Sequence, residues 1–527
     1  DMDVAVSLVL ETIECHKPIV IYGDYDVDGV TSSHLFLTAL RRVGAKVDVV
    51  IPHRIQDGYG LSLHLLQQAK EDGVDTILTC DNGIAAIDEI AWAKAQKMTV
   101  LVTDHHAVPF EEHEGRRTEK KSLADAVVNP HQQDCRYPYK ELCGAGVAWN
   151  VIRVLYENYD MDKREAEDLL DFVAMATVCD VMSLTGENRI LVKEGLKRIR
   201  HTKNIGLQAL MQACNVQPEN ISAYHFGYVL GPCVNATGRL DTARHALRLF
   251  ETGQETEAEE IARDLVDLNQ ERKELTLQGV EMAKKLCEEG GYENDPVLVL
   301  FLPDVHESIA GLIAGRIREM YNRPVFVLTR GEEGVKGSGR STENYSMYEN
   351  MCGCAELFTK FGGHPMAAGL SLPEENVEKF RRKINENCPL TVEEVCPDIH
   401  IDMAMPVGYA STELVHQFAL LEPFGKDNPS PLFADRNLSI SRMWVIGKNR
   451  NVLRMSVLSE YGQPVPVIFF GDVETLFAYF TEKFGQKEVE NALHGRKNRI
   501  LFSMVYTAKI DFYQGNENLQ LEMKYYR

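Results

Sequence analysis

Residues 19–29 read IVIYGDYDVDG, and the rest of the chain is organised around this stretch. The apolar residues 19–22 predict a buried strand, which stops at Gly23 before Gly29 opens a helical pattern. Between them, aspartates occupy every second position: Asp24, Asp26 and Asp28. Three carboxylates at one strand end repel each other unless a cation lies among them, and hard oxygen ligands suit Mg²⁺ or Mn²⁺. The alternative is a solvated acidic turn that caps a helix.

Strands and helices alternate through the residues that follow. Apolar runs at residues 46–52, 75–80, 99–103 and 125–129 predict further strands, and helical patterns cover residues 29–40, 63–70 and 85–96. This alternation predicts an α/β domain with a doubly wound parallel sheet. Such sheets bind ligands beyond the carboxyl ends of their strands.

Polar residues follow the ends of these strands. Asp81 comes directly after the strand at 75–80, and Asp104 and His105 come after the strand at 99–103. A later apolar run, residues 172–184, contains one carboxylate, Asp180, which needs a partner. We expect all these side chains to converge at one edge of the sheet, where carboxylates and an imidazole can hold two metal ions for phosphoester hydrolysis. Taken singly, each feature has a plainer alternative, namely a turn, an ordinary loop pair or a helix cap.

Composition limits the classes of protein to consider. A chain of 527 residues is too long for one core, so we expect three or four domains. The net charge of −22 argues against a general polyanion binder unless basic side chains cluster locally. Twelve cysteines without a CxxC pair predict reduced thiols and a cytoplasmic protein. We find no run long enough for a membrane span and no secretory leader, and because the chain begins at Asp1 we expect an N-terminal piece to be missing.

Four motifs resemble a known family. They are GDYDVDGVTSS at 23–33, CDNGI at 80–84, DHH at 104–106 and VCDVMSL at 178–184, which match in order the core motifs of the DHH phosphoesterase superfamily. Among its branches, the chain is similar over nearly its whole length to the RecJ family of single-strand-specific 5′→3′ exonucleases. The resemblance and the sequence pattern together predict four parts: a DHH catalytic domain with a helical lobe (1–253), a long connecting helix (254–290), a smaller α/β DHHA1 domain (291–392) and an OB-like β-barrel (393–527).

The resemblance implies a metal site with two Mn²⁺ or Mg²⁺ ions. Its expected ligands are Asp26, Asp28, Asp81, His105 and Asp180, with Asp24 completing a coordination sphere. Asp28 and Asp81 are the expected bridging ligands, and Asp104 is expected to orient His105. The expected catalytic residues are Asp81, His105 and His106, of which the last would contact the phosphate.

Two segments outside the strands are candidates for contact with the substrate. Residues 52–62, PHRIQDGYGLS, predict a tight turn at Gly58-Tyr59-Gly60 and carry Arg54, whose planar guanidinium suits a phosphate; the alternative is a surface arginine. Residues 231–239, GPCVNATGR, contain a proline and two glycines, which argue against a helix interior. Asn235 and Arg239 are therefore candidates for the scissile phosphate, and a plain interhelical turn is the alternative. The charged residues 111–121 predict a solvated loop.

Residues 255–289 and the segments after them predict a second half of the substrate cleft. Residues 255–289 form one unbroken helical pattern, about 50 Å long, which suits a strut between domains. Strands are predicted at 296–302 and 324–329, with a helix at 306–318 between them. Residues 336–341, KGSGRS, predict a flexible anion-binding loop, and residues 361–369, FGGHPMAAG, flank a histidine with glycines. The resemblance to DHHA1 domains implies these roles: Ser338 and Arg340 bind the 5′-terminal phosphate, and His364 faces the metal site.

The last 130 or so residues predict a small antiparallel barrel. Short alternating runs lie at 438–445, 452–458, 465–470, 500–506 and 519–523, after a Pro- and Gly-rich entry at 421–433. Cations gather there at Lys448, Arg450, Arg454, Arg496, Lys497 and Arg499, and aromatic residues lie between them at Trp444, Phe469, Phe470 and Tyr506. Such a groove suits single strands, although for the aromatic residues we favour a place in the core.

These features predict a Mn²⁺- or Mg²⁺-dependent exonuclease that degrades single-stranded DNA from the 5′ end to mononucleotides. The family further implies a role in DNA repair and recombination, action as a monomer, no membrane, and a single-strand-binding protein and a helicase as partners. One alternative is another DHH phosphoesterase, such as a nanoRNase, a pyrophosphatase or a cyclic-dinucleotide phosphodiesterase. The other is a catalytically inactive scaffold that binds single strands.

Overall fold

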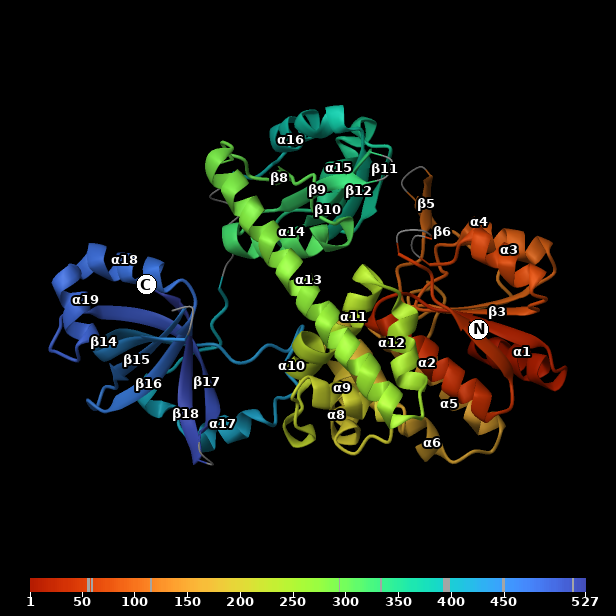
Figure 1. Ribbon diagram of the computed structural model, residues 1–527, viewed down its shortest axis with the longest axis horizontal. Coiled ribbons are helices and arrows are strands. Elements are labelled where there is room, and N and C mark those ends of the chain that lie inside the picture. Colours follow the sequence, from red (N-terminus) through yellow and green to blue (C-terminus); the bar gives the residue numbers. More distant parts are fainter. Residues whose placement is uncertain are drawn as a thin grey trace. The chain divides into compact units, whose positions relative to one another are not determined.

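The chain divides into two compact units, Asp1–Pro397 and Asp398–Arg527. Figure 1 shows the computed structural model, which describes all residues except 55–56, 58–59, 114–115, 293, 332–333, 392–398, 448–450 and 514–515. Four of the residues singled out above, the turn residues Gly58 and Tyr59 and the cations Lys448 and Arg450, lie outside the described residues. Each unit has hydrophobic cores of its own.

The first unit begins with a five-stranded sheet in the order β2-β1-β3-β4-β7, and every pair in it is parallel. Its strands are β1 (Pro18–Tyr22), β2 (Lys46–Val50), β3 (Thr76–Cys80), β4 (Thr99–Thr103) and β7 (Ala126–Val128). The predicted doubly wound sheet is confirmed. The central strands are buried on both faces, which explains why their sequences are nearly continuous apolar runs.

Helices cover both faces of this sheet, as Figure 1 shows. On one face lie α1 (Met2–Glu14), α2 (Val27–Arg42) and α5 (Gly144–Asn158), and on the other α3 (Leu63–Glu71) and α4 (Ile87–Ala95). Alternate residues of β1 pack into the hydrophobic cores on the two faces of the sheet, with Ile19 and Ile21 in one core and Val20 and Tyr22 in the other. The charged segment after β4 forms a two-stranded hairpin of β5 (Phe110–His113) and β6 (Arg116–Glu119), whereas a solvated loop was predicted at residues 111–121.

A helical lobe follows the sheet. It contains α6 (Lys163–Glu167), α7 (Leu170–Cys179), α8 (Gly186–Ile199), α9 (Ile205–Ala213), η1 (Pro218–Asn220), α10 (Ala223–His225), the π-helical turn η2 (Phe226–Leu230), α11 (Gly231–Leu240) and α12 (Ala243–Glu251). The prediction that GPCVNATGR interrupts the helices is wrong, because these residues lie within α11. Pro232 occupies the first turn of α11, which suits proline. A Cβ at Gly238 would lie 2.2 Å from the carbonyl oxygen of Tyr25, so this glycine lets α11 approach the loop after β1.

The long helix α13 (Glu255–Glu289) has 35 residues, and its predicted bounds are confirmed. Near its beginning, Ile261 and Leu265 are buried in the core that the lobe shares with the first sheet. Near its end, Val280 and Ala283 are buried in a different core. The helix therefore connects two hydrophobic cores of the first unit.

The rest of the first unit is a second sheet in the order β11-β12-β10-β9-β8. Its elements are β8 (Leu298–Phe301), η3 (Glu307–Ile309), α14 (Ala310–Tyr321), β9 (Val325–Gly331), β10 (Gly334–Arg340), α15 (Met347–Cys352), η4 (Ala355–Leu357), β11 (Lys360–Gly363), β12 (Ala367–Leu372), η5 (Glu374–Asn376) and α16 (Val377–Glu386). The prediction of a flexible loop at 336–341 is wrong, because most of this segment belongs to the middle strand, β10. A Cβ at Gly337 would lie 2.4 Å from Leu328 Cδ2, so the glycine is needed for packing.

The second unit is a closed barrel of five long strands. They are β14 (Phe433–Ile446), β15 (Val452–Leu458), β16 (Pro464–Phe470), β17 (Leu501–Tyr513) and β18 (Asn516–Tyr526), and β14 pairs with β17 to close the barrel. The other elements are β13 (Met403–Ala404), η6 (Val407–Tyr409), α17 (Thr412–Phe418), α18 (Val473–Phe484) and α19 (Gln486–Leu493). The predicted barrel is confirmed, although β16 and β18 pair in parallel. Phe469 and Tyr506 are core residues as favoured, whereas Trp444 and Phe470 are exposed.

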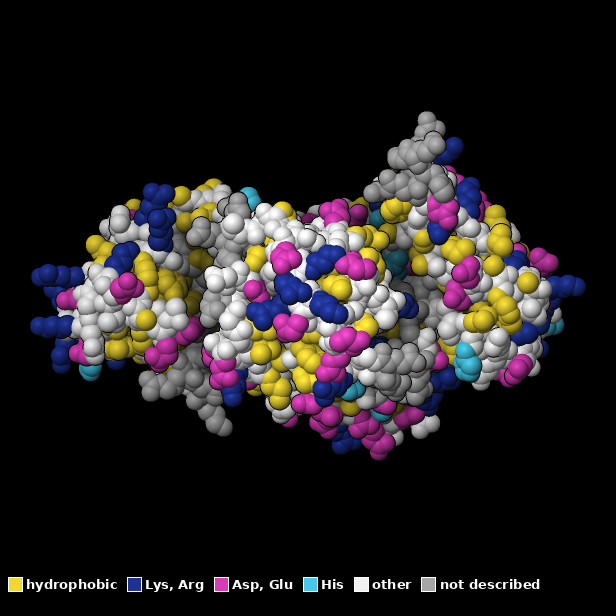
Figure 2. Space-filling view, turned by 90° about the horizontal axis from the view of Figure 1, so that it is seen from above, with side chains coloured by type: hydrophobic (Ala, Val, Ile, Leu, Met, Phe, Trp, Pro, Cys, Tyr) yellow, Lys and Arg dark blue, Asp and Glu magenta, His cyan; other side chains and the backbone are white. Residues whose placement is uncertain are grey.

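The molecular surface carries both signs of charge. On the face seen in Figure 2, acidic and basic side chains are interspersed rather than separated into large fields of one sign. Within the part of the chain that the structure describes, no helix combines the length and the apolar character needed to cross a bilayer.

Candidate metal centre and phosphate pocket

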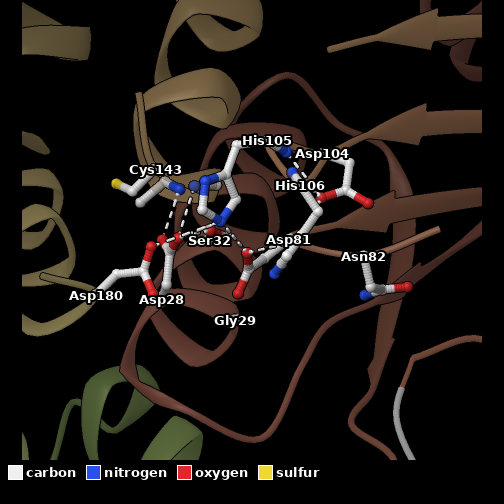
Figure 3. A network of polar contacts seen from close by, with 12 residues as sticks. Asp28, Gly29, Ser32, Asp81, Asn82, Asp104, His105, His106, Cys143 and Asp180 are labelled. Atoms are coloured by element: carbon white, nitrogen blue, oxygen red, sulfur yellow. Dashed lines mark hydrogen bonds and ion pairs between the residues drawn. The ribbon is translucent and has the colours of Figure 1, made fainter. Parts of the chain in front are cut away.

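The predicted metal ligands meet at the carboxyl edge of the first sheet. Four separate segments supply them: the loop between β1 and α2 with the first turn of α2 (Asp24, Asp26 and Asp28), the end of β3 (Asp81), the end of β4 (His105) and the end of α7 (Asp180). Nε2 of His105 lies 3.0 Å from an oxygen of Asp81, 3.6 Å from one of Asp180 and 3.7 Å from one of Asp28. Figure 3 shows the three carboxylates gathered around the His105 ring.

The ligand atoms form overlapping groups that suit two ions. Three sets have atoms within 4.8 Å of one another: Asp24, Asp26 and Asp81; Asp81, His105 and His106; and Asp28, His105 and Asp180. Asp81 and His105 each belong to two of these sets, whereas Asp28 belongs to one. The overlapping sets therefore offer enough donors for two cations, and Asp81 is the carboxylate that two sets share.

The electrostatics of the site favour bound cations. Burial raises the pKa of Asp24, Asp26 and Asp81, and the neighbouring carboxylates raise it further. Oδ1 of Asp24 is buried and accepts no hydrogen bond from any residue that the structure describes. Buried carboxylates so close together need a compensating positive charge. Oxygen donors with one imidazole fit Mn²⁺ or Mg²⁺, so the residues present suit the expected metal ions.

The beginning of α5 holds Asp28 in place. The backbone N–H groups of Gly144 and Ala145 donate to its two carboxylate oxygens at 2.6 and 2.7 Å. These N–H groups have no partner within their helix, and the helix dipole stabilises an anion there. A Cβ at Gly144 would lie 2.6 Å from Cβ of Asp81, so only glycine fits. Our sequence analysis missed this contact; the small residues of CGAG at 143–146, just before an apolar helix, were the available signal.

The Asp104 carboxylate binds the imidazole ring of His106 rather than that of His105. One of its oxygens accepts a hydrogen bond from Nδ1 of His106 at 2.8 Å, and its contact with His105 is to the backbone N–H at 2.7 Å. The expectation that Asp104 orients the His105 ring is therefore wrong. Burial lowers the pKa of both histidines, but Asp104 outweighs this for His106 and raises its pKa to about 9. In the metal-free protein at neutral pH, His105 is thus a neutral potential ligand, and His106 carries a proton.

A cavity of about 840 Å³ brings predicted phosphate-binding residues together. Arg54 lines it beside Tyr25, with its guanidinium carbon 4.9 Å from the centre of the tyrosine ring. Ser338 and Arg340 line it from β10. Burial lowers the pKa of Arg340, and Arg54 lowers it further, because two cations close together each disfavour the other's charge. A phosphate would relieve this repulsion. Tyr25 was missed by the sequence analysis, although it lies inside the first motif.

The structure places the three other predicted substrate contacts differently. Asn235 accepts a hydrogen bond from the backbone N–H of Val27 at 3.1 Å, next to the metal ligands. Arg239 donates to the carbonyl oxygen of Ser308 at 2.6 Å, and burial, with nearby arginines, lowers its pKa to about 10. His364 is exposed in the turn between β11 and β12 and is not among the described residues that line the 840 Å³ cavity. Direct contact of these residues with substrate stays a prediction.

Three family models match the chain. The model of the DHH family N-terminal domain matches residues 18–177, that of the DHHA1 domain matches residues 294–388, and that of the RecJ OB domain matches residues 401–525. A single-stranded-DNA-specific exonuclease RecJ of Haemophilus influenzae is 33% identical over 99% of this chain and 89% of that relative. The RecJ exonuclease of Bacillus subtilis is also 33% identical, over 88% of this chain, which spans only 57% of that relative.

Solved structures agree with these matches. A crystal structure of RecJ with Mn²⁺ from Thermus thermophilus superposes with a TM-score of 0.80 at 26% identity, covering 100% of this chain and 71% of that one. A structure of exonuclease RecJ bound to manganese gives a TM-score of 0.62 at 32% identity, over 73% of this chain and 93% of that one. The parallel sheet with its carboxylate–histidine edge, followed by the second α/β sheet, defines a DHH phosphoesterase. Within that class, the matching barrel and relatives show that the chain belongs to the RecJ family of single-stranded-DNA-specific exonucleases.

Proposed function

We propose that this chain hydrolyses single-stranded DNA from the 5′ end and releases mononucleotides. The observation that carries this proposal is that one unit holds both the carboxylate–histidine site and a cavity lined by Arg54, Ser338 and Arg340. Two Mn²⁺ or Mg²⁺ ions bound at the site would supply an activated water and neutralise charge on the scissile phosphate. The RecJ OB domain supports long strands as substrates rather than the dinucleotides of other DHH enzymes.

The residues of this chain have distinct tasks in the proposed reaction. Asp81 would hold both ions in register, and the beginning of α5 would keep the Asp28 carboxylate oriented. His106, which bears a proton at neutral pH, would donate a hydrogen bond to an oxygen of the scissile phosphate while Asp104 anchors its ring. Because such a donor gains strength as the phosphate gains charge, it would favour the transition state.

The 840 Å³ cavity would account for the proposed end preference. Arg340 and Ser338 would hold the 5′-terminal phosphate, and Arg54 would lie opposite them in the same cavity. A planar guanidinium can bind two phosphate oxygens at once, which gives geometric as well as electrostatic selection. A strand held at this phosphate would present the next linkage to the metal site.

A degradation assay tests this proposal. With Mn²⁺, wild-type protein should release labelled mononucleotide at once from a 5′-labelled single strand and only late from a 3′-labelled one. Asp81→Ala should abolish release and keep strand binding, whereas Asp267→Ala, which changes an exposed carboxylate of α13, should leave activity unchanged. Cleavage retained in Asp81→Ala, or a preference for dinucleotides over long strands, would contradict the proposal.

Arg340→Ala separately tests the pocket. It should remove most of the preference for a 5′-phosphorylated over a 5′-hydroxyl strand, while hydrolysis at saturating strand concentration persists. The measurement is the ratio of kcat/KM for the two strands, and an unchanged ratio would remove Arg340 from this role.

The barrel and the wider context complete the proposal. Trp444 is exposed, with the guanidinium of Arg442 5.7 Å from its ring centre, and this pair with Arg454 would bind single-stranded DNA. We further propose that the protein is a cytoplasmic monomer that works in DNA repair and recombination with a helicase and a single-strand-binding protein. Light scattering tests the monomeric state, and pull-down from a reduced lysate tests the two protein partners.

A further inference from the structure

Two tyrosines stack on each other at the surface of the helical lobe. The rings of Tyr224 and Tyr228 lie 5.1 Å apart with an angle of 24° between their planes. Tyr224 is 62% exposed and Tyr228 is 71% exposed, which places them among the most exposed large apolar side chains described. Large aromatic side chains usually bury their area in a core or at an interface. This pair therefore presents an aromatic surface to solvent.

The helical segment that carries the tyrosines packs against α7, which ends just before the metal ligand Asp180. Tyr228 lies in the π-helical turn η2, and such turns occur frequently at functional sites. Sγ of Cys179, the residue before the ligand Asp180, donates to the carbonyl oxygen of Phe226 in η2 at 3.3 Å. A Cβ at Gly231 would lie 2.3 Å from the same sulfur, so α7 and η2 are in close contact.

Residues 223–240 also link the tyrosines to the phosphate pocket. They form one continuous helical run, α10, η2 and α11. Along it, Asn235 contacts the metal-ligand loop at Val27, and Arg239 contacts Ser308, which lines the pocket. At a helical rise of 1.5 Å per residue, Tyr228 lies roughly 10 Å from Asn235 and roughly 16 Å from Arg239. The run therefore spans the pocket, the metal site and the aromatic pair in that order.

We propose that Tyr224 and Tyr228 form a stacking platform for bases of the DNA strand a few nucleotides from its 5′ end, beyond the scissile linkage. This proposal rests on the proposed function. A strand whose terminal phosphate occupies the pocket and whose first linkage reaches the metals continues along the helical run toward the platform. Stacking on an aromatic ring is sequence-tolerant, because every base has a π-face, and this suits an enzyme that must move along any sequence.

Fluorescence of 2-aminopurine tests where the bases stack. The base is placed at each of positions 2 to 8 of a 5′-phosphorylated 20-mer, and binding is measured with Asp81→Ala protein, which does not degrade the strand. Quenching should peak at one or two consecutive positions, disappear when Tyr224→Ala and Tyr228→Ala are added, and persist with Tyr224→Phe and Tyr228→Phe. The same quenching profile in the alanine variant would overturn the proposal.

Kinetics of the active protein separate a platform from a structural role. In the double alanine variant, KM for the 20-mer should rise at least about fivefold with little change in kcat, and hydrolysis of a 5′-phosphorylated dinucleotide should be unaffected because it ends before the platform. Tyr159→Ala, at an exposed tyrosine after α5, should change neither. Equal losses on both substrates, or no loss on either, would overturn the proposal, whereas wild-type protein inactive on both would overturn the proposed function instead.

Discussion

Gly144 shows how one missing side chain shapes the active site. It donates its N–H to Asp28, and its Cα faces Asp81 so closely that any Cβ would collide with that ligand. We expect Gly144→Ala to weaken Mn²⁺ binding by about 10- to 100-fold, as losses of supporting contacts in metal sites do. Isothermal titration with Mn²⁺ measures this. Gly315→Ala is the matched control, because a Cβ there meets nothing within 4 Å, and equal affinities of the two variants would contradict the prediction.

Asp81 illustrates a conflict between stability and function. Without metal, its charge is opposed first by burial and then by Asp28 and other carboxylates, which raise its pKa. We therefore expect Asp81→Asn, in EDTA, to increase the free energy of unfolding by about 1 kcal/mol while it abolishes hydrolysis. Urea denaturation measures the first effect. Mn²⁺ should raise the melting temperature of the wild type more than that of the variant, since binding to the folded state stabilises it.

Residue identities at the metal site were largely predictable, but their contacts were not. Aspartates that end strands of a parallel sheet must meet at one edge, so the convergence of Asp28, Asp81 and His105 follows from the order of strands and helices. The N–H groups that bind Asp28 come from 116 and 117 residues further along the chain, and the small residues of CGAG do not indicate which carboxylate they meet. Which histidine Asp104 orients depends on ring geometry that the DHH motif does not encode.

Helix α2 carries a buried histidine that makes stability depend on pH. The ring of His34 lies 4.4 Å from that of Phe172, and burial, with a smaller effect of Arg41, lowers its pKa to about 3. The unfolded chain protonates His34 near pH 6.5, whereas the folded protein excludes this proton down to about pH 3. The free energy of unfolding therefore keeps its full value above pH 6.5 and declines as the pH falls from 6.5 toward 3, by up to about 1.4 kcal/mol per pH unit.

His34→Leu should therefore show a shallower decline of unfolding free energy between pH 6.5 and 4.5 than the wild type. Urea denaturation at half-unit steps gives the two slopes, and the exposed His201→Leu is the control that should keep the steeper one. Identical slopes for wild type and His34→Leu would rule out this assignment.

Two segments rich in glycine or proline were among those whose structure the sequence analysis predicted wrongly. KGSGRS and GPCVNATGR have the composition of loops, yet one lies largely in the middle strand of a sheet and the other in a helix. In both segments, tertiary packing overrides local propensity. A side chain at Gly337 would collide with Leu328, and one at Gly238 would collide with the backbone of Tyr25. By contrast, α13 has a regular apolar stripe, a single glycine and no proline, and its limits were predicted correctly.

At the scale of the whole molecule, the chain divides between residues 397 and 398 into a unit with the candidate active site and a unit with the barrel. All the metal-ligand candidates and the lining of the 840 Å³ cavity belong to the first unit. We expect residues 1–397, expressed alone, to hydrolyse a 5′-phosphorylated dinucleotide as fast as the full chain, with a raised KM for a 20-mer. Steady-state kinetics on both substrates test this, and loss of dinucleotide hydrolysis by a folded fragment would refute it.

The ligand set spans residues 24 to 180, and its last member comes from a helix added after the whole parallel sheet. During synthesis on the ribosome, the emerging polypeptide therefore lacks a complete ligand set until α7 has left the exit tunnel and docked. The cavity lined by Ser338 and Arg340 is completed later still. We therefore expect a product truncated before these segments to lack a complete active site.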